Sequence, residues 1–92
     1  MIVRIASEGQ FRLDDSLAGQ LNDFDNQLVQ VVDSGSEAQF APLLARMLDF
    51  VRSKGQPMAD DDLSASQVVL PPPDIDFDEA QHLFKGDGLI AG

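Results

Sequence analysis

The sequence predicts an α+β fold, in which a small β-sheet is covered by an antiparallel pair of helices. An apolar segment at residues 2–6 is followed by alternating apolar and polar residues at 10–13, which is the pattern of a half-buried strand. Apolar residues then recur every three or four positions in two segments between residues 14 and 55, separated only by residues 34–36. A link this short joins antiparallel helices. The chain of 92 residues has the size of one domain, which we expect to span residues 1–92.

Residues 2–6 and 10–13 are expected to form a β-hairpin at the start of this fold. The first segment is largely apolar, and in the second Phe11 and Leu13 alternate with polar neighbours. Gly9 lies between the two segments, where a tight turn needs a residue that tolerates positive φ. The hairpin therefore supplies two strands of the predicted sheet.

The first long helix is expected to begin near residues 14–16, where Asp and Ser side chains can cap it, and to end at Gly35. Spacings of four, three, four and three residues place one set of apolar side chains on a single stripe: Leu17, Leu21, Phe24, Leu28 and Val31. The opposite face is assigned to a polar set: Asn22, Asp23, Asp25, Asn26 and Gln30. Where the two long helices meet, we expect a buried set: Leu21, Phe24, Leu28, Leu44 and Met47.

The second long helix has a wider apolar face and is expected to end at Gly55. Ser36 and Gln39 match the S-x-x-Q pattern of a capping box. Pro42 leaves two alternatives open. It lies inside the helix and kinks it if Ser36 is the cap, or it occupies the favoured first position if the regular helix starts near Ala41.

The last third of the chain is predicted to be a polar loop over residues 55–66, a third strand at 68–70 and a short helix. Three prolines end the strand. Asp76 and Glu79 form a D-x-x-E cap for the helix, whose apolar positions include Phe77 and Phe84. The order of the strands in the sheet does not follow from these patterns.

Charge is the strongest feature of the composition. Six Lys and Arg residues stand against sixteen Asp and Glu residues, so the formal net charge is −10. This charge repels nucleic acid and the anionic inner face of a membrane, and it favours a basic protein partner. No apolar run is long enough to span a bilayer, and there are no cysteines. We expect a soluble cytoplasmic protein, which a partner could recruit to the inner face of the cell membrane.

Few residues suggest chemistry. Asp60, Asp61 and Asp62 are consecutive, and three neighbouring side chains do not easily converge on one cation, so we interpret this run as a solvated loop. His82 is the only histidine, and its helical neighbours Asp78 and Glu79 would merely form a surface pair with it. We therefore expect no enzymatic activity, no cofactor and no metal.

Several segments, taken in order, resemble the PspA-associated (PspAA) domain family. They are the opening strand with E-G-Q-F and L-D-D-S-L, then L-N-D-F-D-N, then AQFAPLLARMLDFVRSKGQPMADDDLSASQVVLPPPD, and finally DGLIAG. In the last of these, Ala91 stands where the resemblance leads us to expect Pro. The resemblance covers essentially the whole chain but brings no catalytic or binding residues with it.

This resemblance implies a small accessory or adaptor protein of the phage shock, or envelope-stress, response. Its implied partner is phage shock protein A, a coiled-coil, ESCRT-III-like protein at the inner face of the cell membrane. The alternative from charge alone is an acidic protein that inhibits or mimics a nucleic-acid surface for a DNA-binding partner.

Candidate partner-binding residues follow from the predicted elements and the charge. For electrostatic steering we select Asp23 and Asp25 on the first long helix and Asp60, Asp61 and Asp62 in the loop. For the apolar contacts that would hold a complex we select Phe40 and Val51, on an edge of the helical pair. Whether the protein self-associates, and which face binds, does not follow from the sequence.

Overall fold

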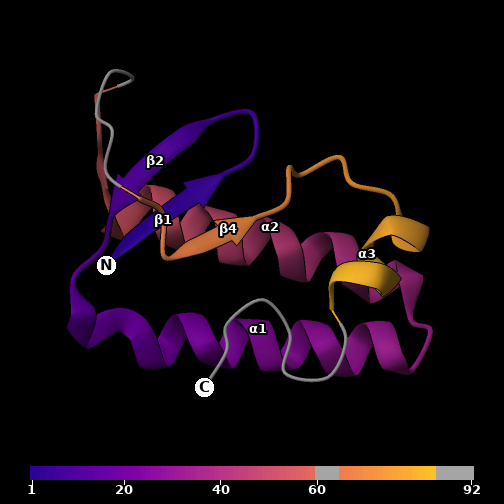
Figure 1. The fold of residues 1–92 in the computed structure, drawn as a ribbon. Helices are drawn as coiled ribbons and strands as arrows, with labels where there is room; N and C mark the ends of the chain where they lie inside the picture. Colours follow the sequence, from indigo (N-terminus) through magenta and orange to yellow (C-terminus); the bar gives the residue numbers. More distant parts are fainter. Residues whose placement is uncertain (60–64, 85–92) are drawn as a thin grey trace.

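The computed structural model describes residues 1–59 and 65–84 of the chain, and its α+β fold confirms the predicted class (Figure 1). A mixed four-stranded sheet lies against two long helices, with a short third helix at one end. The strands are β1 (Ile2–Ile5), β2 (Gly9–Arg12), β3 (Gln56–Pro57) and β4 (Val68–Leu70). The helices are η1 (Asp15–Leu17), α1 (Ala18–Asp33), α2 (Glu37–Lys54) and α3 (Phe77–Leu83).

The sheet has the strand order β3-β2-β1-β4. β1 and β2 form the predicted antiparallel hairpin, although β2 begins and ends one residue earlier than expected. β4 pairs with β1 in parallel, with Val3 opposite Val68. β3 was not predicted, since residues 55–66 were assigned wholly to a loop. It is only two residues long, and Pro57 is tolerated because β3 is an edge strand.

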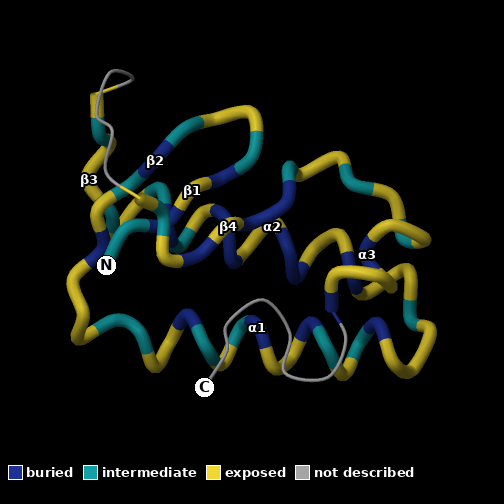
Figure 2. Tube along the Cα trace, in the orientation of Figure 1, coloured by how far each residue is buried: buried dark blue, intermediate teal, exposed yellow. Residues whose placement is uncertain are grey.

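α1 and α2 form the predicted antiparallel pair; in Figure 1 α2 passes behind the sheet and α1 lies beneath it. Gly35 has φ +74°, and its N–H and that of Ser36 bond back to the carbonyls of Val32 and Val31, which ends α1. The inner faces of the sheet and both helices share one hydrophobic cluster, seen as the dark blue segments of Figure 2. Leu21, Leu28, Leu44 and Met47 are buried as predicted.

The buried face of α1 is rotated by about one residue from the predicted stripe. The buried positions are Leu21, Asp25, Leu28 and Val32. Phe24, predicted to be core, is half-buried and packs against Phe50 with ring centroids 5.6 Å apart. α1 contacts both α2 and α3, and Phe24, Val29 and Val31 on its flanks pack against the core cluster.

The start of α2 answers one open question from the sequence and contradicts one prediction. Pro42 lies inside the helix, five residues after its start at Glu37, so the helix does not begin near Ala41. The predicted capping box does not form, because the Ser36 side chain makes no cap hydrogen bond. Its hydroxyl lies 3.1 Å from that of Ser34 instead.

Candidate functional site

α3 is held against the turn between α1 and α2 by three aromatic rings. The Phe40 ring centroid lies 5.8 Å from that of Phe77 and 5.8 Å from that of Phe84, both in edge-on geometry. Asp76 caps the helix as predicted, because its Oδ1 accepts a 2.8 Å hydrogen bond from the Glu79 N–H. This short helix therefore has a defined position, which in turn places the acidic residues around it.

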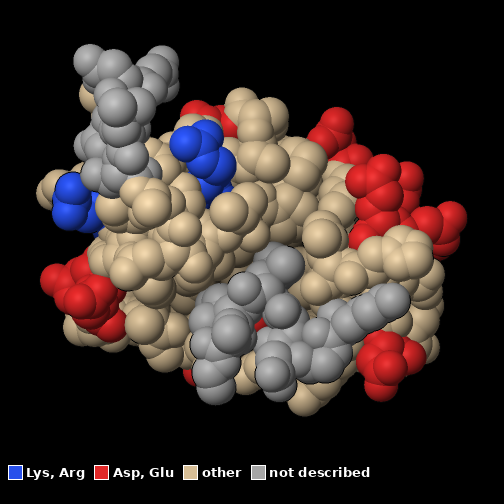
Figure 3. Space-filling model, viewed as in Figure 1, with Lys and Arg blue, Asp and Glu red and all other residues tan. Residues whose placement is uncertain are grey.

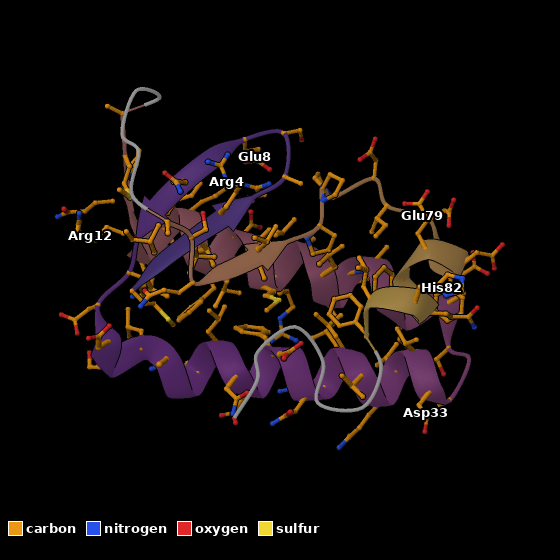
Figure 4. The ribbon with its side chains drawn as sticks, viewed as in Figure 1. Arg4, Glu8, Arg12, Asp33, Glu79 and His82 are labelled. Carbon is orange, nitrogen blue, oxygen red and sulfur yellow. The ribbon has the colours of Figure 1, made fainter. Side chains whose placement is uncertain are left out.

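One end of the molecule is densely acidic. We call it the acidic end, and it comprises the exposed residues Asp33, Glu37, Asp74, Asp76, Asp78 and Glu79. The described residues of the elements that build it, 31–45 and 71–84, include no Lys or Arg. Figure 3 shows red side chains gathered at this end, and Figure 4 places Asp33, Glu79 and His82 there. The described residues 31–45 and 71–84 therefore form a negative surface, with Arg46 as the next cation along α2.

The outer face of the sheet carries the opposite charge. The register pairs Ile2 with Arg12 and Arg4 with both Gln10 and Val69, so these side chains project from the face that points away from the helices. Arg4, Arg12 and Val69 are exposed, and we call these three residues the basic sheet face. Figures 3 and 4 show both arginines away from the acidic end. Within residues 1–59 and 65–84, neither arginine makes an ion pair.

A third charged group is structural. Arg52 of α2 donates two hydrogen bonds to the Glu8 carboxylate in the β1–β2 turn, at 2.7 and 2.5 Å, and a third to Asp49 at 2.7 Å. The bonds from Arg52 lower the pKa of Glu8, and the same bonds raise the pKa of Arg52. This bidentate pair fastens the hairpin to α2, so both side chains already have a charged partner within the fold.

A shallow depression of about 540 Å³ lies beside the N-terminus. It is lined by Met1, Arg12, Leu13, Asp14, Asp15, Lys54 and Gln56. The Met1 amino group donates to the Leu13 carbonyl at 2.7 Å and to Asp15 at 2.8 Å, and the Ser16 N–H lowers the pKa of Asp14. Charges of both signs line this hollow, but it brings together no nucleophile and base.

Within the part of the chain that the structure describes, no group of three or more His, Cys, Asp or Glu side chains could hold a metal ion. His82 is exposed on α3. None of the described helices combines the length and the apolar character that crossing a bilayer requires.

The structure separates the sequence-predicted site residues. Asp23 is exposed on α1, as expected. The expected exposure of Asp25 is wrong, since its exposed fraction is 0%. Phe40 and Val51, selected for apolar contacts with a partner, have exposed fractions of 3% and 0%. Asp25 lies on the rotated inner stripe of α1 and has an interaction partner, Phe40 anchors α3, and Val51 belongs to the core cluster. Asp60, Asp61 and Asp62 lie outside the described residues.

Sequence reasoning missed the acidic end as a surface. Its signal was the alternation of Asp74, Asp76 and Asp78 beside Glu79, which was interpreted as a helix cap and a surface pair with His82. Nothing in local sequence places that segment beside Asp33 and Glu37. The packing of Phe40 against α3 does so.

The family model of the PspA-associated protein matches residues 1–92, the whole chain. Comparisons with curated proteins and with solved structures gave no significant match.

Proposed function

The chain belongs to the PspA-associated protein family, and from this membership we propose that it is a non-enzymatic adaptor that binds a phage shock protein A-type partner. The match of the family model over residues 1–92 is the observation that carries the proposal. The proposed setting is the envelope-stress response, with the protein in the cytoplasm and recruited to the inner face of the membrane by its partner.

A binding role agrees with the described surface. The acidic end and the basic sheet face are open surfaces of opposite charge. An enzyme that acts on small molecules would instead need polar side chains around an enclosed pocket. Enzymes also place ionisable groups in sites that perturb their pKa. The perturbed carboxylates that the structure describes, Glu8 and Asp14, instead hold the hairpin and cap η1.

The acidic end is the surface that we propose meets the partner. Its carboxylates are exposed, and the described residues 31–45 and 71–84 include no Lys or Arg, so their field reaches a basic protein surface before contact. Exposed charges of this kind raise association rates more than they lengthen residence times. We thus add the acidic end to the residues proposed for steering, of which Asp23, Asp60, Asp61 and Asp62 stay predictions and Asp25 is buried.

Surface plasmon resonance with an immobilised phage shock protein A homologue tests this proposal. The variant Asp78→Asn/Glu79→Gln removes two charges from the acidic end and keeps the Asp76 cap. We expect its association rate to fall about threefold or more at low ionic strength, with a nearly unchanged dissociation rate. The control Asp15→Asn/Asp49→Asn removes the same charge at exposed positions elsewhere and should change the rate less.

The outcomes separate the parts of the proposal. Absence of wild-type binding to this homologue would contradict the adaptor role. Binding that both double variants slow equally would show that net charge steers the partner and that the acidic end has no special part. Binding indifferent to either variant and to salt would rule out electrostatic steering.

A further inference from the structure

Two large hydrophobic side chains are exposed among the described residues. One belongs to the basic sheet face and the other to the acidic end. Val69 is 54% exposed and belongs to the basic sheet face, and Leu83 is 42% exposed and lies on α3 at the acidic end. An isolated exposed hydrophobic residue needs no explanation. Here, however, the described charged neighbour of Val69 is Arg4, whereas that of Leu83 is Glu79, so the two signs are opposite.

On the basic sheet face, Val69 of β4 is the registered neighbour of Arg4 on β1, so their side chains stand side by side on the same face, about 5 Å apart at Cβ. Arg12 lies on the same face, paired with Ile2, which is two residues before Arg4. The face therefore offers two cations beside one aliphatic side chain. No carboxylate among the described residues satisfies either cation within 4 Å.

At the acidic end, Leu83 and Glu79 are four residues apart on α3, which places them next to one another on the helix surface. Asp78 and Asp76 continue the negative charge toward the start of the helix. The surface therefore offers several anions beside one aliphatic side chain. It is complementary to the basic sheet face in both charge and apolar content.

We propose that the basic sheet face binds the acidic end of a second copy of this chain. The two surfaces belong to different parts of the molecule, with α3 beyond one end of the sheet, so they cannot meet within one chain in this fold (Figures 3 and 4). Contact between two different surfaces is heterologous: each copy keeps one free surface, and the contact extends into a row of copies or a closed ring.

The net charge of −10 opposes this association at long range, so the contact is weak and appears at high protein concentration. A second copy is the occupant because the same chain presents the matching charge and the matching apolar residue. The inference does not rest on the proposed function, and its test uses this protein alone.

Sedimentation velocity over protein concentrations up to about 1 mM, where weak contacts are populated, tests the proposal. The wild type should show a sedimentation coefficient that rises with concentration. Two variants, Arg4→Glu/Arg12→Glu in the sheet face and Asp78→Lys/Glu79→Lys at the acidic end, should each lose about tenfold or more in association constant. Mixing the two variants should restore association, because one supplies an intact acidic end and the other an intact basic face.

A matched control separates contact from net charge. Arg46→Glu/Lys54→Glu changes the net charge by the same amount as Arg4→Glu/Arg12→Glu but lies on α2, and it should weaken association less. Circular dichroism confirms that each variant is folded, and Val69→Ser and Leu83→Ser are milder substitutions that should weaken association without charge reversal. A monomeric wild type at the highest concentration, or equal weakening by the control, or failure of the mixture to associate, would overturn the proposal.

Discussion

The sheet end and the α3 end of this molecule are held together by different means. β1 and β2 exchange a backbone ladder, β4 adds to it in parallel, and the Glu8–Arg52 pair fastens the turn to α2. α3 has seven residues, no strand partner, and an attachment centred on three aromatic rings. The acidic surface is therefore carried by the element with fewer independent supports.

This difference teaches that one side chain can control the acidic end while the rest of the fold persists. A helix of seven residues is not stable alone in water, so α3 depends on the side chains that dock it. The sheet end has many small supports, and the loss of any one of them should have a small effect.

The largest effect is expected for Phe40→Ala, which should cost about 3–5 kcal/mol as a large-to-small change at a buried ring. α3 should lose its amide protection before β1 and β2 lose theirs, because the ring docks α3 directly. Hydrogen exchange followed by mass spectrometry measures both regions.

Leu28→Ala is the control in the centre of the core, and it should cost about 2–4 kcal/mol and lower protection at both ends together. If Phe40→Ala lowers amide protection equally in α3 and in β1 and β2, the two ends are not supported by different means.

A smaller effect is expected for Asp76→Ala, which removes the cap of α3. The Glu79 N–H loses its 2.8 Å acceptor, and the cost should be about 0.5–2 kcal/mol. Asp76→Asn keeps an acceptor oxygen and should recover most of the loss. Chemical denaturation gives the free energies of unfolding. If Asp76→Asn and Asp76→Ala are equally destabilised, charge and not capping is the reason.

The smallest effect is expected at the sheet end, for Glu8→Gln, which should cost about 0.5–1 kcal/mol because the pair with Arg52 is partly exposed. The pKa of Glu8 is lowered in the folded state, so its contribution is present above the ordinary carboxyl pKa and is lost as pH falls through the lowered value. The difference in stability between wild type and variant should thus be constant above about pH 5 and shrink below about pH 4. Thermal melts across this range measure it, and a difference that grows on acidification would contradict the assignment.

Much of the local structure could be predicted from the sequence. The helical pair with its turn at Gly35, the β1–β2 hairpin and the Asp76 cap depend on residues within a few positions of one another. Side-chain spacing, capping oxygens and the conformational freedom of glycine operate at that range, and they were sufficient for these elements, although the capping box predicted at Ser36 does not form.

The candidate site was largely not predictable. Hydrophobic spacing defines a stripe on α1 but does not decide which of two adjacent lines faces the core, and a carboxylate gives no sign that it will be buried. Asp25 was therefore assigned to the surface, whereas it is fully buried and has an interaction partner in the folded chain. Phe40 was assigned to a partner because its contacts with Phe77 and Phe84 bridge more than thirty residues of sequence.

By itself, then, the sequence determined the helices, the hairpin, the total charge and the family resemblance. Only the tertiary structure decided the strand order, the existence of β3, the phase of α1 and the separation of charge into a basic sheet face and an acidic end. The physical reason is the distance along the sequence over which each effect acts. Propensity and capping are local, whereas sheet order and surface charge depend on which distant segments share a core, and that is settled by packing.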